Sequence, residues 1–165
     1  MSMPGRSSLF IFCPWCGAEL IAFSDDGFER RKCLKCRWIQ YRNPTVGVAV
    51  VLLEANRLLL GLRPVGTWCI PCGHVEWDET IEAAARREMK EETGLEVKLS
   101  GILSVQSNFH APEQQTVGIW FRGHRTGGEL HAGSDLKEVR FFDLSSIPEL
   151  SFPTDRQVVE RLLVS

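Results

Sequence analysis

The stretch of sequence that decides the fold is GHVEWDETIEAAARREMKEETGL, residues Gly73 to Leu95. Its second half predicts an α-helix, because it is rich in alanine and other good helix formers. Thr80 is a suitable N-cap residue, and Gly94 stands where a left-handed residue ends a helix. The stretch therefore predicts a short loop followed by one well-capped central helix.

Three glutamates share one face of this predicted helix. Glu88, Glu91 and Glu92 occupy positions i, i+3 and i+4, which a helix brings together. Such crowded carboxylates repel one another at neutral pH, so a cation must offset their charge. Hard oxygen ligands suit Mg²⁺ or Mn²⁺, which also bind substrate phosphates. The alternative is a solvated acidic face, but this side of the helix continues into apolar residues, which is unusual for a merely wet surface.

Two basic residues stand among these glutamates. Arg87 and Lys90 are adjacent to them in sequence, but each is expected to point elsewhere on the helical wheel. Arg87 is well placed to hold an acidic partner such as Glu79. That pair would fix the loop that precedes the helix.

The sequence on either side of the central helix reads as strands followed by a final helix. The Val- and Leu-rich segments Val46–Leu53 and Arg57–Arg63 predict two strands joined by a tight turn. Further strands are expected at Val97–Gln106, Thr116–Arg122 and Val139–Asp143. The last segment, FPTDRQVVERLLV, predicts a helix with Pro153 in its first turn. This order of elements indicates an α/β sandwich around a mixed sheet.

Upstream of the first strand, four cysteines form two C-x-x-C pairs. Cys13 and Cys16 are followed, after an insert long enough for a hairpin, by Cys33 and Cys36. This spacing is typical of a structural Zn²⁺ site with four thiolate ligands. A segment of this size buries too little apolar area to fold alone, so a metal would stabilise it. The alternatives are two disulfides or four unrelated thiols. We expect a small zinc ribbon at residues 9–42 and a second domain at residues 43–165, after a disordered lead at residues 1–8.

Composition and charge narrow the functional classes. Charged residues make up 24% of the 165-residue chain, and the formal net charge is −2. The chain therefore has no overall positive charge that would indicate binding to nucleic acid or to an anionic membrane. The basic and aromatic stretch RRKCLKCRWIQYR makes nucleic acid a candidate partner of the ribbon, but a solvated face is the favoured interpretation. With no signal peptide or apolar span visible, a cytoplasmic location without a membrane contact is expected.

The stretch from Gly73 to Leu95 resembles the Nudix box. That motif reads Gly, five residues, Glu, seven residues, Arg-Glu, an aliphatic residue, any residue, Glu-Glu, any residue, Gly and an aliphatic residue. Every fixed position matches, and Met89 stands where Ile, Leu or Val is usual. The resemblance implies an α/β/α sandwich around a mixed sheet, here preceded by the zinc ribbon. The third cysteine pair, Cys69 and Cys72, is not expected to join the zinc site, because Pro71 between them removes an amide donor and works against a metal-binding knuckle.

The resemblance also implies an activity and a set of site residues. Nudix enzymes hydrolyse a nucleoside diphosphate linked to another group, with Mg²⁺ or Mn²⁺ held by Glu88, Glu91 and Glu92. The implied catalytic residues are these three glutamates together with Arg87 and Glu79. Candidate substrate-binding residues are Arg63, Glu76 and Glu138. Candidates for the general base, besides the box glutamates, are Glu113, Glu129, Asp135 and Glu138.

The substrate is less well defined by the resemblance. A ribbon ahead of the box is similar to the NADH pyrophosphatase branch, but the Ser-Gln-Pro-Trp-Pro-Phe-Pro stretch of that branch is replaced here by SVQSNFHAPEQQ. ADP-ribose or an FAD-like substrate is therefore expected, with NADH or NAD as the alternative. A non-enzymatic sensor module, whose ribbon binds nucleic acid or a protein, is the alternative from another class. Many relatives are dimers, so a homodimer is an open expectation.

Overall fold

The computed structural model describes residues 10–111 and 114–164, which divide into two compact units. The first unit holds residues 10–44, and Gln114 is grouped with it; the second holds residues 45–111 and 115–164. The predicted lead at residues 1–8 and the candidate base Glu113 lie outside the described residues. The predicted domain boundary between residues 42 and 43 stays a prediction, since a compact unit is not by that alone an independently folding domain.

The first unit is a small three-stranded antiparallel sheet with the strand order β1-β2-β3. The insert between the two cysteine pairs does form a hairpin, and its tip residues Asp26 and Gly27 have positive φ angles of 48° and 83°. The core of the unit consists of Cys13, Leu20 and Cys33, with Cys16, Ala18 and Trp38 packed against it. Half of these six residues are cysteines, so little apolar area is available to hold the unit together. Its strands are β1 (Leu20–Asp25), β2 (Phe28–Cys33) and β3 (Ile39–Gln40).

The second unit is built on a mixed seven-stranded sheet. Its main path runs β10-β5-β4-β9-β8, while β6 pairs with β5 and β7 pairs with β4. The central strand β4 is parallel to β9 and antiparallel to β5 and β7. The strands are β4 (Thr45–Glu54), β5 (Arg57–Leu62), β6 (Trp68–Cys69), β7 (Cys72–His74), β8 (Leu95–Ala111), β9 (Gln114–Gly128) and β10 (Glu138–Asp143).

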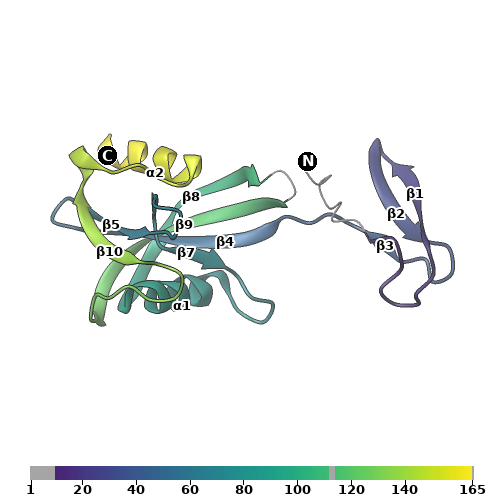
Figure 1. Cartoon of the computed structure of the whole chain (residues 1–165), viewed down its shortest axis with the longest axis horizontal. Helices are drawn as coiled ribbons and strands as arrows, with labels where there is room; N and C mark the ends of the chain where they lie inside the picture. Colours follow the sequence, from purple (N-terminus) through teal and green to yellow (C-terminus); the bar gives the residue numbers. More distant parts are fainter. Residues whose placement is uncertain (1–9, 112–113, 165) are drawn as a thin grey trace. The chain divides into compact units, whose positions relative to one another are not determined.

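Helices α1 (Ile81–Thr93) and α2 (Pro153–Leu163) lie on opposite faces of this sheet (Figure 1). The alternation of side chains along β4 explains how this one strand packs against both helices. Val48, Val50 and Leu52 pack in the core that contains Ala84, Ala85 and Met89 of α1. Ala49 and Val51 pack instead in the core that contains Val158, Val159 and Leu162 of α2. Successive side chains of a strand point to opposite faces, so β4 is apolar on both, and the expected α/β/α sandwich is confirmed.

The structure adds elements that the sequence patterns did not indicate. Strands β6 and β7 are two and three residues long, and a short 3₁₀-helix, η1 (Leu144–Ser146), follows β10. Strand β8 also extends from Leu95 to Ala111, beyond the expected Val97–Gln106. Segments of two or three residues show no periodicity, so only their pairing partners reveal them. Within the described residues, no helix is long and apolar enough to cross a membrane.

Candidate active site and zinc site

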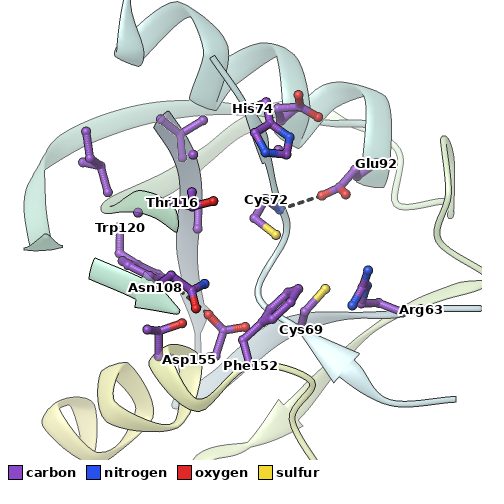
Figure 2. A pocket seen from close by; sticks show the side chains of 18 of the residues that line it. Arg63, Cys69, Cys72, His74, Glu92, Asn108, Thr116, Trp120, Phe152 and Asp155 are labelled. Atoms are coloured by element: carbon purple, nitrogen blue, oxygen red, sulfur yellow. Dashed lines mark hydrogen bonds between the residues drawn. The ribbon is translucent and has the colours of Figure 1, made fainter. Parts of the chain in front are cut away.

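A cavity of about 550 Å³ opens in the second unit, between α1 and the N-terminal end of α2 (Figure 2). It collects side chains from both helices and from the sheet between them. Of the residues predicted from the sequence to act at the site, Glu88, Glu92, Arg63 and Glu76 line its wall. The candidate base Asp135 lines it as well. This cavity is therefore the candidate active site.

The helix that carries the glutamates has the ends that its sequence predicts. The Thr80 hydroxyl accepts a hydrogen bond of 3.2 Å from the Ala83 amide. Gly94 has a left-handed φ of 72°, and its amide donates to the Lys90 carbonyl. These caps satisfy backbone groups that would otherwise be free at each end, and they fix where the helix begins and stops. The positions of the glutamates along α1 are therefore set locally.

The first glycine of the motif makes room for one of the glutamates. A Cβ atom built on Gly73 would lie 1.9 Å from Cδ of Glu88, a distance at which the two groups cannot coexist. Glycine thus lets the Glu88 carboxylate lie directly against the backbone of β7, on the wall of the cavity. This close approach explains why the sequence needs a glycine fifteen residues before Glu88.

Glu92 is the buried carboxylate of the site. The residue is 4% exposed, and its Oε2 accepts a 2.7 Å hydrogen bond from the Cys72 amide (Figure 2). Burial raises the pKa of Glu92 to about 8, and the nearby charges of Asp135 and Glu88 act in the same direction. The Cys72 amide and the more distant Arg63 lower the pKa, and so offset part of that shift. Without a cation, the fold therefore disfavours the ionised form of this side chain.

Arg87 does not point away from the glutamates, and here the expectation from the helical wheel was wrong. Its Nη1 lies 2.8 Å from Glu88 Oε1 and 3.1 Å from Glu91 Oε2. The long side chain reaches along the helix, so the direction of its Cα–Cβ bond does not limit its contacts. Its Nη2 also donates to the His74 carbonyl at 3.0 Å and pairs with Glu79. The predicted Arg87–Glu79 contact is thus present, and it lowers the pKa of Glu79.

The donor set of the glutamates fits a hard divalent cation. Glu88 and Glu92 offer carboxylate oxygens on the cavity wall, and the side chain of Glu91, one turn from Glu88, is 51% exposed. Carboxylate oxygen is the ligand that Mg²⁺ and Mn²⁺ prefer. In the described part of the chain, only the four ribbon cysteines form a group of three or more side chains whose ligand atoms all lie within 4.8 Å of one another. The carboxylate oxygens of the three glutamates are therefore farther apart than the cysteine sulfurs.

The four ribbon cysteines form a compact cluster. Cys13 Sγ lies 3.4 Å from Cys36 Sγ, and Cys16 Sγ lies 3.4 Å from Cys33 Sγ. Sulfurs around a tetrahedral zinc ion are about 3.8 Å apart, since each Zn–S bond is about 2.3 Å. The Cys36 amide donates to Cys33 Sγ and lowers the pKa of Cys33 to about 6, whereas contacts among the four sulfurs raise the pKa values of Cys16 and Cys36. The donor set therefore fits Zn²⁺.

Cys69 and Cys72 lie in the second unit, outside this cluster, as the sequence predicted. Both line the cavity of the candidate active site. A hydrogen bond with the neighbouring Cys69 thiol, together with burial, raises the pKa of Cys72 well above its ordinary value. A thiol held in its protonated form is a poor nucleophile, so Cys72 is not set up as one.

The basic residues of the ribbon lie among aromatic rings of the same unit. The guanidinium of Arg30 lies 5.6 Å from the centre of the Phe28 ring and 4.8 Å from that of Tyr41. Lys32 lies 4.6 Å from the centre of the Phe23 ring. These cation–π contacts give the aromatic residues a structural role. Nucleic acid as a partner of the ribbon stays a prediction.

Some candidates from the sequence are not brought to the cavity. Glu138 does not line it; its side chain is 47% exposed and lies 3.5 Å from Arg140. Glu129 is exposed and is not part of the wall either. The loop that contains Asp135 does reach the cavity, because the Gly133 amide donates to the Glu92 carbonyl at 2.9 Å and ties the loop to the end of α1.

Sequence reasoning missed the residues at the other side of the cavity. Asn108, Phe152, Thr154 and Asp155 all line it, and Figure 2 shows three of them opposite Glu92 and His74. Asp155 is 2% exposed and accepts hydrogen bonds of 3.0 Å from the Ile70 amide and from Trp120 Nε1. An acidic residue in the first turn of a helix normally indicates only a favourable helix end. Nothing local in the sequence signals that Asp155 is buried.

The buried Asp155 makes stability depend on pH in a predictable direction. Burial raises the pKa of Asp155 from 3.8 to about 6, against the opposing effect of its two hydrogen bonds and Arg63. A raised pKa in the folded state stabilises the protein below pH 4, and this contribution is lost as the pH rises to about 6. We expect the stability of the wild type relative to Asp155→Asn to fall by up to about 3 kcal/mol over that range.

Urea unfolding of both proteins between pH 4 and pH 8 measures this difference. Asparagine has one acceptor oxygen for two N–H donors, so the variant also carries a constant penalty. That penalty changes the stability difference between the two proteins by the same amount at every pH, so it does not alter how the difference varies with pH. A stability difference that does not vary with pH would show that Asp155 ionises normally in the folded protein.

Taken together, an α/β/α sandwich and a cavity walled by the glutamates of a Gly73–Leu95 motif define a phosphoanhydride hydrolase of the Nudix class. The chain belongs to this family: the NUDIX domain family model matches residues 42–162. The non-enzymatic alternative is therefore not supported, and the chain is a Nudix hydrolase.

Two groups of relatives have names that specify a substrate. An ADP-ribose pyrophosphatase of Methanocaldococcus jannaschii is 40% identical over 121 residues, which cover 70% of this chain and 72% of that protein. An NAD-capped RNA hydrolase of Vibrio atlanticus is 28% identical over 144 residues, or 85% of this chain. The match covers 52% of that protein, so the chain spans about half the length of this relative.

Among solved structures, a NUDIX hydrolase from Nitrosomonas europaea superposes with a TM-score of 0.83 at 30% identity. The superposition covers 94% of this chain and 91% of that one. The arrangement of elements described above is therefore one that a related protein adopts along nearly its whole length.

Proposed function

We propose that this protein hydrolyses the phosphoanhydride of an ADP-linked nucleotide such as ADP-ribose. The observation that carries the proposal is the pair of carboxylates, Glu88 and Glu92, on the wall of one cavity large enough for a nucleotide. The similarity to an ADP-ribose pyrophosphatase over most of the chain supports the choice of substrate. In the reaction, water and ADP-ribose would give AMP and ribose 5-phosphate.

Glu88, Glu91 and Glu92 are the residues that would hold Mg²⁺ or Mn²⁺. A bound divalent cation offsets the charge of the diphosphate and polarises its phosphoryl oxygens. The protein supplies the conditions for this. Gly73 leaves space for Glu88, and the Cys72 amide orients Glu92. Arg87 neutralises part of the negative charge on Glu88 and Glu91.

Two further residues would bind and position the substrate. Arg63 lines the cavity, and its guanidinium lies 4.8 Å from the centre of the Phe152 ring, so it is held against the wall with its charge available to a phosphate. Glu76 also lines the cavity, and its amide donates to Glu79 Oε1 at 2.9 Å. The Arg87–Glu79 pair then acts indirectly, by fixing the loop that carries Glu76.

Asp135 is the best candidate for the general base among the described residues. It is the one loop carboxylate of the four sequence candidates that both lies in the described part of the chain and lines the cavity. Its charge raises the pKa of Glu92, which indicates that the two side chains are close. As a base, Asp135 would accept a proton from the water that attacks phosphorus.

Replacement of Asp135 by Asn should lower kcat by about 10²- to 10⁴-fold, the usual contribution of general-base catalysis, with little change in KM. The measurement is a pH–rate profile of both proteins with ADP-ribose. Glu129→Gln, on an exposed residue outside the cavity, is the matched control. If Asp135→Asn keeps the wild-type kcat, the base lies elsewhere.

The alternative substrate class is NAD or NADH, which the similarity to NAD-capped RNA hydrolases supports. A substrate panel decides between the two: ADP-ribose, FAD, NADH, diadenosine polyphosphates and nucleoside triphosphates, each with Mg²⁺ and with product phosphates released by a coupled phosphatase. Preference for ADP-ribose supports the proposal, and preference for NADH supports the alternative. Absence of turnover with every compound would contradict both.

Three further expectations belong to this proposal. Zn²⁺ is proposed as a structural ion of the ribbon, without a part in catalysis, because a four-cysteine site leaves no open coordination position. A homodimer and a cytoplasmic location stay predictions. A nucleotide-type small molecule is the expected partner, and names of both groups of relatives agree with that class.

A further inference from the structure

The cavity has two chemically different ends. One end carries the Glu92 carboxylate and the His74 imidazole, and the other carries Asn108, Trp120, Phe152 and Asp155 (Figure 2). Glu88 lies against Gly73, the residue before His74, and Thr154 is the neighbour of Asp155 in α2. At this second end the Asp155 carboxylate is turned into the wall, where it accepts hydrogen bonds from the Ile70 amide and Trp120 Nε1, and aromatic rings and an amide make up the rest. A diphosphate at the charged end places one of its two substituents toward this wall. The aromatic end is therefore where part of the substrate other than the diphosphate is recognised.

Thr154 carries an unsatisfied hydrogen-bonding group at this end. The residue is 6% exposed, and its Oγ1 is the one buried side-chain oxygen or nitrogen in the described part of the chain that has no hydrogen-bond partner. Buried polar groups are nearly always paired, because an unpaired one costs stability. An unpaired hydroxyl on the wall of a cavity is therefore explained best by a partner that the substrate brings.

The neighbours of Thr154 cannot take that role. The two oxygens of Asp155 already accept hydrogen bonds from the Ile70 amide and Trp120 Nε1, so Asp155 holds the wall in place. The carbonyl of Thr154 accepts a hydrogen bond from Gln106 Nε2, and this contact leaves the hydroxyl free. Rotation about χ1 exchanges the hydroxyl and the methyl group, and threonine in helices populates two such rotamers. A ligand in the cavity can thus draw the hydroxyl toward itself.

We infer that the aromatic end of the cavity binds the purine base of the substrate and that the Thr154 hydroxyl hydrogen-bonds to it. The Phe152 ring contributes aromatic surface to this end of the wall. The Asn108 side chain contributes a polar amide to the same part of the wall. This inference rests on the proposed function, because it assumes that the diphosphate lies at the charged end.

Two substitutions of Thr154 separate the hydroxyl from the shape of the side chain. Thr154→Val keeps the volume and removes the hydroxyl, whereas Thr154→Ser keeps the hydroxyl. We expect Thr154→Val to weaken AMP binding by roughly three- to tenfold, the worth of one neutral hydrogen bond, and to raise KM for ADP-ribose by a similar factor with kcat unchanged. Thr154→Ser should bind AMP nearly as the wild type does. Calorimetry measures AMP and ribose 5-phosphate binding without any need for turnover.

Thermal unfolding adds a readout that a purely structural role would not produce. Removing an unpaired hydroxyl should leave the melting temperature of Thr154→Val equal to or above that of the wild type. Thr93→Val is the matched control, because Thr93 is also buried in a helix but its hydroxyl donates to the Met89 carbonyl at 2.6 Å and accepts from the Leu95 amide at 3.2 Å. Its melting temperature should fall.

The results distinguish the inference from the proposed function. Weaker AMP binding by Thr154→Val, with ribose 5-phosphate binding unchanged, supports a base site even if ADP-ribose is not hydrolysed. Hydrolysis of ADP-ribose with equal AMP affinity in the wild type and Thr154→Val would overturn the inference and leave the proposed function intact. No measurable binding of AMP to the wild type would also overturn it.

Discussion

Replacement of Glu92 by glutamine is expected to reduce kcat/KM for the preferred substrate by at least about a thousandfold. A metal-bound phosphoryl group gains several kcal/mol of transition-state stabilisation from its cation, and each 1.4 kcal/mol or so is worth a factor of ten. Glutamine keeps the size of the side chain and an oxygen that can accept from the Cys72 amide, but it removes the negative charge. Steady-state hydrolysis at several Mg²⁺ concentrations measures the loss.

The expected loss is not a loss of folding. Because burial raises the pKa of Glu92 to about 8, an uncharged amide should be tolerated at this position at least as well as a carboxylate. The melting temperature of Glu92→Gln without metal should therefore match or exceed that of the wild type. Glu82→Gln is the control, since Glu82 is exposed in the first turn of the same helix. Wild-type activity in Glu92→Gln would exclude this carboxylate from catalysis.

The second large effect is expected from removal of zinc. Replacement of Cys33 by serine, or treatment with a strong chelator, should unfold residues 10–44. The apolar core of that unit consists of Cys13, Leu20 and Cys33, so the metal must supply most of its stability. Structural zinc ions contribute on the order of 10 kcal/mol in comparably small domains. Mass spectrometry of metals should find about one zinc ion per wild-type chain and far less in the variant.

The location of the damage is part of this prediction. Limited proteolysis should cut the zinc-free protein within residues 10–44 and leave residues 45–111 and 115–164 protected, because the second unit has two apolar cores of its own. Cys69→Ala is the control: Cys69 lies outside the sulfur cluster, so its zinc content should equal that of the wild type. A Cys33→Ser protein with full zinc content and a protected ribbon would contradict the structural role.

Much of the fold could be predicted from the sequence because its signals are local. Helix α1 was expected from its alanines, from Thr80 and from Gly94, and the structure has caps at both residues. The strands β4 and β5 and the turn between them were visible as Val- and Leu-rich segments around Asn56. Periodicity and capping are properties of neighbouring residues, so they can be read without a tertiary structure.

The candidate site could be predicted only in part, because only some of its residues are brought together by local structure. Glu88 and Glu92 were found because one helix carries both. Asp135 could not be chosen from four acidic candidates, since its position depends on a hydrogen bond between Gly133 and the end of α1. The contacts of Arg87 with Glu88 and Glu91 depend on side-chain reach, which a helical wheel does not describe.

The sequence by itself determined the family motif, the position of its glutamates on one helix and the four-cysteine pattern of the ribbon. Each of these depends on the identity and spacing of residues within one short segment. Only the tertiary structure decided which residues face the cavity opposite the glutamates. Asp155 meets the Ile70 amide across 85 positions of the chain and Trp120 across 35, and the unpaired hydroxyl of Thr154 lies next to it in the same wall. Such contacts are set by strand register and helix packing, which bring distant segments together and leave no periodic trace in the sequence.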